Sequence, residues 1–435
     1  MTTTYWCARA WLPDGVADAV RIEVADGRIT EVAPDSPRTG TVLTGLTLPG
    51  FANGHSHAFH RALRGRTHHE RGTFWTWRDR MYSLAARLDP DAYYRLARGV
   101  YAEMVLTGYT SVGEFHYLHH APGGKPYAEP NAMGEALRRA AADAGIRLTL
   151  LDTCYLAGGI GVEPDEVQQR FSDGSAENWA RRVAGMGEDE LFRVGGAIHS
   201  VRAVPADQLS DVDNGTPSAR PLHIHLSEQR AENEQCLSAY GRTPTTILYD
   251  HGVLGERLTA VHATHLTQHD IERLGAARGR ACFCPTTERD LGDGIGPARA
   301  LLDAGVRLCV GSDSNAVVDA FEETRALELN ERLASEERGR FAADELLAAA
   351  TDHGAVGWPE VGTLAVGAGA DLVTVGLGSV RTAGIEPSGA IFAASGADVR
   401  HVVVAGREIV RDGEHRLIER PETVLAKEIE ALWQF

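Results

Sequence analysis

The sequence predicts an α/β protein that consists of a distorted (β/α)8 TIM barrel and a small β-sandwich built from both chain termini. Three observations support this fold class. The chain has 435 residues, which is long for one ordinary domain but fits a barrel with a smaller appendage. Both ends are rich in short strand-like segments, and the middle alternates apolar runs with helical stretches. We therefore expect the β-sandwich at residues 1–48 and 362–435 and the barrel at residues 49–361.

The two ends of the chain share one pattern, in which short apolar runs are separated by turns that contain glycine. Asp26–Gly27 is such a turn, and the glycine-rich stretch 367–370 precedes another run. The expected strands are Ala19–Val24, Ile29–Val32, Val42–Leu48, Leu372–Val375, Val402–Val404 and Ile409–Val410. Two β-rich ends around a long middle predict one small domain that the termini form together.

The middle of the chain repeats a unit of a short apolar strand followed by a helix. The clearest helical stretches are Tyr93–Leu106, Ala132–Ala144, Ala298–Ala304 and Glu322–Ala334. Repeated strand-then-helix units imply parallel strands joined by crossover helices. Roughly seven or eight such units fit into the middle of the chain, which favours a closed barrel over an open sheet.

Composition excludes several classes of partner. The formal net charge is −17, which argues against nucleic acid or an anionic membrane as a partner. This net charge is compatible with a small anionic substrate, because a few well-placed arginines in the binding site determine whether an anion binds. No apolar run approaches the ~20 residues of a membrane helix, and the start of the chain shows no secretory signal. The six scattered cysteines are typical of reduced thiols, so we expect a cytoplasmic protein.

The sharpest local motif is a pair of histidines, His55 and His57, after the apolar stretch 48–52. At the period of a strand, both imidazoles project from one face and supply half of a tetrahedral metal site. A histidine pair of this spacing is common, so it is a weak signal when taken alone.

Three later segments strengthen the metal hypothesis. His225 lies in a strand-like segment with Glu228 just beyond it, His262 ends another apolar run, and Asp313 follows a fourth. In a parallel barrel the carboxyl ends of the strands carry the active site. Chance poorly explains histidines or carboxylates at four such ends.

Simpler interpretations stay open for individual residues. His223 is expected to be a packed or supporting histidine, and Asp313 could cap a helix. The pairs His68–His69 and His119–His120 are expected in loops, and Cys282-x-Cys284 lacks a second pair at zinc-finger spacing.

Taken together, these residues resemble the amidohydrolase superfamily, and within it the subfamily of formimidoylglutamate deiminases. The similarity extends over essentially the whole chain. The motifs that carry it are Pro49–His57 with the continuation to Leu63, Phe74–Arg78, Glu114–Tyr117, Ile198–Arg202, Val261–Leu266 and Gly362–Val373. The resemblance implies a cytoplasmic hydrolase of histidine degradation that converts N-formimino-L-glutamate, a small anionic amino-acid derivative, to N-formyl-L-glutamate and ammonia, and it makes a homodimer plausible.

The resemblance also implies a set of site residues. One divalent metal ion, expected to be Zn²⁺, would be held by His55, His57, His225 and Asp313. Glu228, His262 and Asp313 would be catalytic. The implied substrate contacts are His60, Arg78, Tyr117, His199 and Arg202. The family usually has glutamine at the position of His60, so this departure bears on substrate choice.

Chemically, a divalent ion of this type lowers the pKa of bound water to about 7. Asp313 would take the water proton, His262 would stabilise the tetrahedral intermediate and Glu228 would pass the proton to the departing nitrogen. Arg78 and Arg202 would hold the substrate carboxylates. The stretch Gly195–His199 offers no lysine to bridge two metals, so a single ion is expected.

Alternatives remain. A deaminase acting on a guanine- or cytosine-like heterocycle, or on N-formimino-L-aspartate, would use the same metal and acid–base residues. A non-catalytic barrel would be expected to have lost ligands, and a binuclear amidase would need the missing lysine. The residue types alone leave zinc, iron and manganese open.

Overall fold

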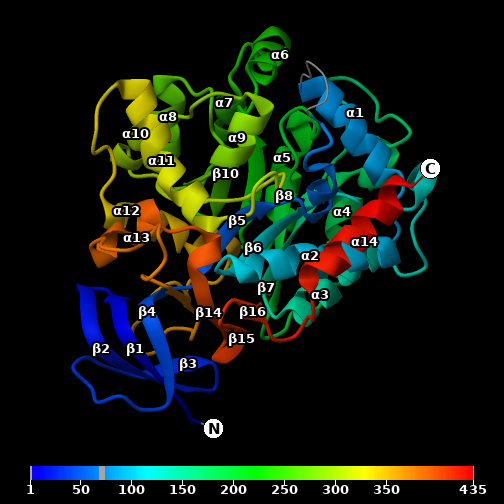
Figure 1. Cartoon of the computed structure of the whole chain (residues 1–435). Coiled ribbons are helices and arrows are strands. Elements are labelled where there is room, and N and C mark those ends of the chain that lie inside the picture. Colours follow the sequence, from blue (N-terminus) through cyan, green and yellow to red (C-terminus); the bar gives the residue numbers. More distant parts are fainter. Residues whose placement is uncertain (1, 68–73, 435) are drawn as a thin grey trace.

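A computed structural model of the chain describes residues 2–67 and 74–434, and within them the strands form two eight-stranded sheets (Figure 1). One is the parallel sheet of the barrel, and the other is assembled from both ends of the chain. The fold class predicted from the sequence is confirmed. The exact boundaries of the two predicted domains stay a prediction, and His68 and His69 lie outside the described residues.

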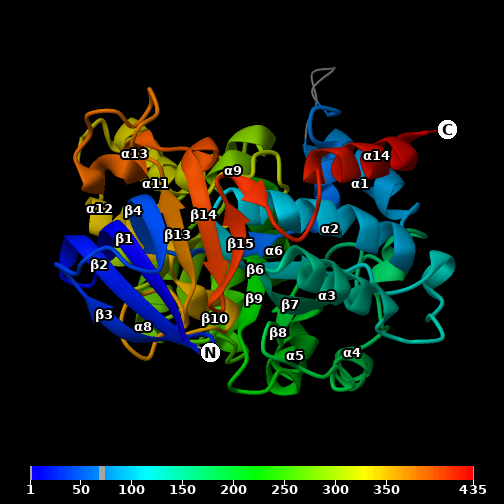
Figure 2. The same cartoon turned by 60° about the horizontal axis from the view of Figure 1, so that its bottom comes forward.

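The terminal sheet has the strand order β16-β15-β14-β13-β4-β1-β2-β3 (Figure 2). Its strands are β1 (Thr2–Leu12), β2 (Gly15–Ala25), β3 (Arg28–Ala33), β4 (Thr41–Pro49), β13 (Leu372–Val375), β14 (Val399–Val404), β15 (Arg407–Arg411) and β16 (Glu414–His415). Strand β4 joins the two ends, because it pairs in parallel with β1 and antiparallel with β13. Its Thr47 and Thr374 of β13 are register partners whose hydroxyl groups lie 2.9 Å apart.

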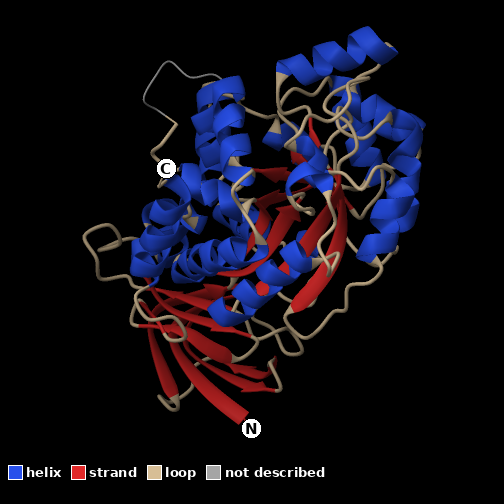
Figure 3. Ribbon diagram, turned by 90° about the vertical axis from the view of Figure 1, so that its right-hand side faces the viewer, coloured by secondary structure: helices blue, strands red, loops and turns tan. Residues whose placement is uncertain are grey.

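The terminal sheet has a core of its own. Cys7, Ile22, Leu43, Leu372 and Val403 belong to one buried cluster, separate from the larger core of the barrel. Strand alternation explains the cluster, since inward and outward residues alternate along β1 and β2. Figure 3 shows this sheet below the barrel and its surrounding helices.

The barrel consists of eight parallel strands in sequential order. They are β5 (Phe51–Ser56), β6 (Tyr109–His116), β7 (Arg147–Cys154), β8 (Phe192–Ile198), β9 (Leu222–Leu226), β10 (Leu258–His262), β11 (Arg280–Phe283) and β12 (Arg307–Val310). The first and last strands meet at a seam just beyond their carboxyl ends. There the Asp313 N–H donates to the His55 carbonyl and the His57 N–H donates to the Asp313 carbonyl, each at 2.9 Å. The barrel is thus closed by the chain segments that carry the predicted metal ligands.

Helices surround the barrel, and their ends follow ordinary capping rules. Asp89 caps α2 and Pro90 opens it, while Thr267 and Asp270 form a capping box on α8. The α-helices are α1 (Phe74–Ala85), α2 (Pro90–Leu106), α3 (Ala132–Ala144), α4 (Ala176–Val183), α5 (Leu209–Gly215), α6 (Arg230–Tyr240), α7 (Pro244–Asp250), α8 (Gln268–Ala277), α9 (Pro285–Leu291), α10 (Ala298–Asp303), α11 (Ala320–Ser335), α12 (Ala343–Ala350), α13 (Ala390–Ala393) and α14 (Pro421–Trp433). The 3₁₀ helices are η1 (Ala58–Leu63), η2 (Pro122–Gly124), η3 (Gln168–Phe171), η4 (Ala206–Gln208), η5 (His353–Val356), η6 (Pro387–Gly389) and η7 (Gly396–Asp398).

The C-terminal helix α14 returns to the barrel and lies along α2 (Figure 1). Arg95 of α2 forms an ion pair with Glu428 at 2.8 Å, and the Trp433 indole N–H donates to the Ala62 carbonyl at 2.9 Å. This helix was not among the elements predicted from the sequence. None of the helices in the described part of the chain is both long and apolar enough to cross a membrane.

Candidate active site

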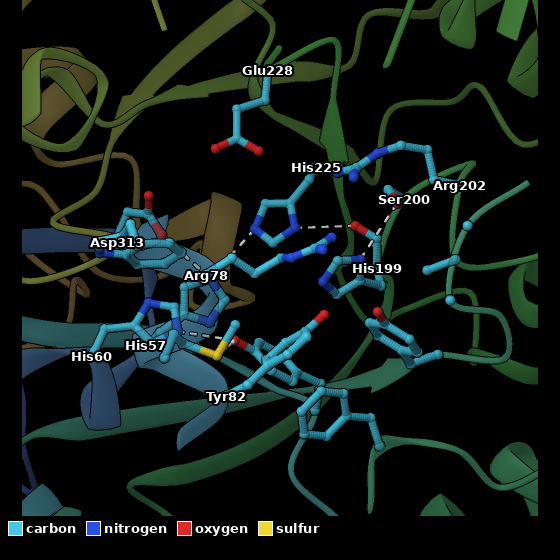
Figure 4. Close-up of a pocket in the computed structure, with 18 of the residues that line it drawn as sticks. His57, His60, Arg78, Tyr82, His199, Ser200, Arg202, His225, Glu228 and Asp313 are labelled. Atoms are coloured by element: carbon cyan, nitrogen blue, oxygen red, sulfur yellow. Dashed lines mark hydrogen bonds and ion pairs between the residues drawn. The ribbon is translucent and has the colours of Figure 1, made fainter. Parts of the chain in front are cut away.

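A single pocket at the carboxyl ends of the barrel strands gathers the residues singled out from the sequence. In Figure 4, Asp313, His57 and His60 lie on its left, His199, Ser200 and Arg202 on its right, and Arg78 between them. The predicted residues that line it are His57, His60, Arg78, Tyr117, His199, Arg202, His225, Glu228, His262 and Asp313. His55 does not line the pocket and is completely buried behind it.

Four side chains converge at the base of the pocket. His55 and His57 project from the end of β5, His225 comes from β9, and Asp313 follows β12. The three Nε2 atoms lie 3.0–3.4 Å from one another. The Asp313 Oδ1 atom lies 3.4 Å from Nε2 of His55 and 3.3 Å from Nε2 of His57.

These separations fit a metal ion. Four ligand atoms placed tetrahedrally at ~2.0 Å from one centre stand about 3.3 Å apart, which is close to the spacing observed. The Nδ1 atoms of His57 and His225 each lie against a backbone carbonyl, at 3.0 and 3.1 Å. A proton on Nδ1 leaves the Nε2 lone pair free, as a metal ligand requires. Burial also lowers the pKa of all three imidazoles, that of His55 to about 3, so they are neutral near pH 7.

Backbone geometry at the barrel rim helps to aim these side chains. Ser227, His262 and Asp313 have φ angles of 52°, 69° and 39°, in the left-handed region that residues other than glycine rarely adopt. Each lies at or just beyond the end of a barrel strand, where the chain turns. Strain of this kind persists where the surrounding structure enforces it, and it is concentrated at functional sites.

Beside these four side chains, His262 lies between two carboxylates. Its Nε2 is 3.9 Å from Oε1 of Glu228 and 3.8 Å from Oδ2 of Asp313. Burial alone would lower the pKa of His262, but Glu228, Glu288 and Asp313 together raise it to about 10. Burial raises the pKa of Glu228, while the adjacent imidazole opposes that rise. A cation held by Asp313 would offset part of this negative charge, so the pKa of His262 would be raised less.

The remaining predicted residues line the pocket around these groups. His60 Nε2 lies 2.9 Å from the Tyr117 hydroxyl, and burial keeps the pKa of His60 well below its usual value. The positive charge of Arg202 faces the Glu232 carboxylate. Nε of Arg202 lies 3.8 Å from Oε1 of Glu232, which is too long for a hydrogen bond. The guanidinium of Arg78 lies over the ring of Tyr82, 5.5 Å from its centroid.

Several lining residues were not predicted from the sequence, and four of them are aromatic. Tyr155 and Ser200 directly follow barrel strands, so an inspection of every strand end would have found them. Tyr82 and Phe171 come from α1 and η3, where no sequence signal marks them. The additional lining residues are Trp77, Met81, Tyr82, Tyr155, Ala157, Gly158, Gly159, Phe171, Ser200, Ala203 and Leu291.

A second group of close polar side chains lies outside the pocket. His116, His119 and Asp152 have potential ligand atoms within 4.8 Å of one another. The Asp152 carboxylate, however, already accepts hydrogen bonds from both terminal nitrogens of Arg182, at 2.8 and 2.9 Å, and from the Trp179 indole N–H. A guanidinium on the carboxylate disfavours another cation there. The loop position predicted for His119 is confirmed, although its side chain is buried.

Cys284 also lies within ligand distance of His262 and Asp313. Burial raises the pKa of its thiol well above the usual value, so the thiolate that a metal would require is disfavoured.

Comparisons with known proteins identify the family of the chain. The amidohydrolase family profile matches residues 46–409, and the profile described as the N-terminal domain of formimidoylglutamate deiminase HutF matches residues 2–40. The formimidoylglutamate deiminase of Pseudomonas aeruginosa is 39% identical over 433 residues, 95% of each chain. A 5-methylthioadenosine/S-adenosylhomocysteine deaminase of Syntrophobacter fumaroxidans is 30% identical, covering 92% of this chain and 90% of that enzyme.

Solved structures show the same architecture. An amidohydrolase from Brucella melitensis matches with a TM-score of 0.91 and 34% identity, over 99% of this chain and all of the other. An atrazine chlorohydrolase from Arthrobacter aurescens, complexed with zinc, matches with a TM-score of 0.86 over 99% of each chain. At 23% identity the latter shows only a shared fold.

Proposed function

This chain belongs to the amidohydrolase family, and from that premise we propose that it catalyses the hydrolytic deimination of N-formimino-L-glutamate. The products are N-formyl-L-glutamate and ammonia, and the reaction belongs to histidine degradation. The protein is a hydrolase that acts on a C–N bond. Its full-length similarity to a formimidoylglutamate deiminase supports this substrate over others in the family.

The observation that carries the proposal is the charge of the pocket. Glu228 and Asp313 supply acidic groups, and Arg78 and Arg202 supply guanidinium groups, to one pocket. An N-formimino group is an amidine and is cationic near neutral pH, whereas the glutamate part carries two carboxylates. A substrate with one cationic and one dianionic end therefore finds complementary groups in this pocket.

We propose that His55, His57, His225 and Asp313 hold one divalent metal ion, Zn²⁺ by preference. The three neutral imidazoles and the carboxylate fit such an ion in donor type and spacing. When bound, the ion polarises a water molecule and lowers its pKa to about 7.

The protein groups then move the protons. Asp313 Oδ2, on the side facing His262, accepts a proton from the attacking water. His262 accepts a hydrogen bond at Nε2 from the attacking water, and so orients the oxygen that bonds to the amidinium carbon. Glu228 transfers the proton of the newly formed C–OH group to the departing nitrogen as the C–N bond breaks, and Asp313 returns its proton to the ammonia. The amidinium carbon gains one oxygen, and the leaving nitrogen departs as ammonia.

Substrate orientation decides which amidine nitrogen leaves. Arg78 and Arg202 bind the two carboxylates of the substrate, and Tyr117, His60 and His199 supply further polar contacts around it. With the glutamate end held by the arginines, its nitrogen stays bound and the terminal nitrogen is directed to Glu228. This arrangement favours ammonia over formamide as the product.

Location and assembly complete the proposal. All six cysteines are free and buried, which supports a reducing, cytoplasmic environment. A homodimer is proposed from the family resemblance, and light scattering on the purified protein tests it.

The direct test is the rate of ammonia release by metal-loaded enzyme. N-formimino-L-glutamate is compared with N-formimino-L-aspartate, guanine, cytosine and adenosine, and formamide is measured in parallel. We expect the highest kcat/KM for N-formimino-L-glutamate, with one ammonia released per substrate and no formamide. Faster turnover of a ring substrate would contradict the proposal.

A second candidate is deamination of a flat heterocycle, and one observation favours it. Trp77, Tyr82, Tyr155 and Phe171 line the pocket, and aromatic walls suit a planar ring. The 30% identical deaminase acts on such a ring, as its name states. The two arginines distinguish the candidates, because a neutral ring offers no carboxylate for them.

A further inference from the structure

The ring of His262 has two nitrogens that face different surroundings. Nε2 faces the pocket, near Glu228 and Asp313. Nδ1 faces the protein interior, where it lies 3.4 Å from Oε1 of Glu288. Glu288 is only 3% exposed and does not line the pocket. Its contact with His262 connects it to the proposed catalytic groups.

The Glu288 carboxylate is itself held in place. It lies in α9, directly after β11, and its Oε1 accepts the backbone N–H of Cys284 at 2.8 Å. The Glu288 carbonyl accepts the N–H of Asp293 at 2.9 Å. A buried carboxylate fixed in this way presents an acceptor to Nδ1 at a defined position.

We propose that Glu288 is a positioning residue that fixes the orientation and the tautomer of the His262 imidazole. In the metal-loaded protein, where a cation on Asp313 weakens the protonation of His262, the neutral imidazole carries its proton on one of its two nitrogens, and the acceptor at one nitrogen decides which. With the proton on Nδ1 directed to Glu288, Nε2 is the nitrogen that meets the reacting oxygen. The ring plane is also fixed, because a hydrogen bond at Nδ1 restrains rotation about the side chain.

This inference rests on the proposed function, in which His262 acts at the reacting oxygen. It adds a residue that neither the sequence motifs nor the lining of the pocket indicated. Glu288 belongs to the segment Cys284-Pro-Thr-Thr-Glu288. The proline of this segment indicates the start of a helix, but no pattern in it indicates a contact with His262.

The experiment compares Glu288→Leu and Glu288→Gln with a matched control, Glu323→Leu. Glu323 is also fully buried and also supports the start of α9, since it accepts the N–H of Thr286 at 3.0 Å. Both leucine substitutions remove a carboxylate that binds a backbone N–H beside the same helix, but only Glu288 touches His262.

We expect Glu288→Leu to lower kcat at least tenfold, with KM changed less than threefold and with full metal content by elemental analysis. Glu288→Gln, which keeps a neutral acceptor, should fall between it and the unmodified enzyme, and Glu323→Leu should keep kcat within twofold. Equal losses in the two leucine variants, or a kcat within threefold of normal in Glu288→Leu, would overturn the inference.

A spectroscopic measurement tests the same point without substrate. In zinc-loaded protein labelled with ¹⁵N-histidine, the signals of His262 are identified by their loss in His262→Asn. We expect a proton on Nδ1 in the unmodified protein and a changed tautomer in Glu288→Leu, with Glu288→Gln available should the leucine variant not fold. An unchanged tautomer would refute the inference, whereas failure to hydrolyse N-formimino-L-glutamate would refute only the proposed function.

Discussion

Replacing Arg202 with methionine tests whether the pocket recognises a carboxylate. The guanidinium is balanced by Glu232 across 3.8 Å, and its Nε makes no hydrogen bond to the described residues. Its donors are therefore oriented by charge and remain available to a ligand. Methionine fills similar space but removes both the charge and the donors.

The size of the effect follows from the lost contact. A hydrogen bond to a charged group contributes about 1.5–3 kcal/mol, and each 1.36 kcal/mol corresponds to about a tenfold change. Loss of one carboxylate contact at the upper end of that range lowers kcat/KM about a hundredfold. Most of this should appear as a higher KM, because the carboxylate contact is the same before and during the reaction.

Glu232 needs a separate control, because Arg202→Met removes its counter-ion. Burial raises the pKa of Glu232 to about 7 even with Arg202 present, so without Arg202 the side chain takes up a proton rather than staying charged. The double variant Arg202→Met/Glu232→Gln should regain any lost thermal stability and keep the weakened kcat/KM.

The assay is steady-state ammonia release from N-formimino-L-glutamate, with metal content measured on each preparation. A KM within threefold of the unmodified enzyme would refute the role of Arg202. So would a loss of activity that parallels a loss of metal, since Arg202 is not a proposed ligand.

Three further predictions address the metal, the acid–base group and the buried core. Glu228→Gln should keep the metal and lose at least ~10²-fold in kcat; full activity in this variant would exclude the proposed proton transfer. His225→Ala, or chelation of the unmodified enzyme, should abolish metal binding and activity and lower Tm by removing a ligand of the folded state; an unchanged Tm after complete metal removal would contradict this. Burial raises the pKa of Glu114 to about 8 from its usual 4.5, so between those pH values the unfolded chain has released a proton that the folded chain retains. The free energy of unfolding should therefore fall as pH rises through this window. Glu114→Gln should flatten the dependence of Tm on pH. Parallel curves of Tm against pH for the variant and the unmodified protein would show that Glu114 is ionised in the folded state.

Sequence patterns identified the elements whose signals are local. Residues 132–144 form the helix α3 as predicted, because apolar and alanine residues recur at helical spacing and Gly145 ends the helix in a left-handed conformation. Residues 372–375 form strand β13 as predicted. The C-terminal helix α14 was missed because only strands were predicted at that end of the chain.

The site could be assembled from the sequence because its polar side chains lie at strand ends. The two-residue period places His55 and His57 together, and the parallel barrel brings the ends of β9 and β12 to the same rim. Nothing of this kind marks Tyr82 or Phe171, which reach the pocket from segments outside the strands. Only tertiary structure reveals them.

Glu288 illustrates the remaining limit. In the sequence, Glu288 is an acidic residue in the first turn of a short helix, where carboxylates are common. Its contact with His262 depends on how β10 and β11 pair, with Val261 beside Cys282. A register shift of one residue would change that contact without changing any local pattern.

The seam between β5 and β12 has a consequence for biosynthesis. Two of the proposed ligands stand near the start of the chain, and Asp313 stands on the other side of the closing seam. A chain emerging from the ribosome therefore presents only an incomplete set of donors until its eighth barrel strand has been made. Tight metal capture should follow completion of the barrel, so a truncated chain that ends before Asp313 should retain little bound ion.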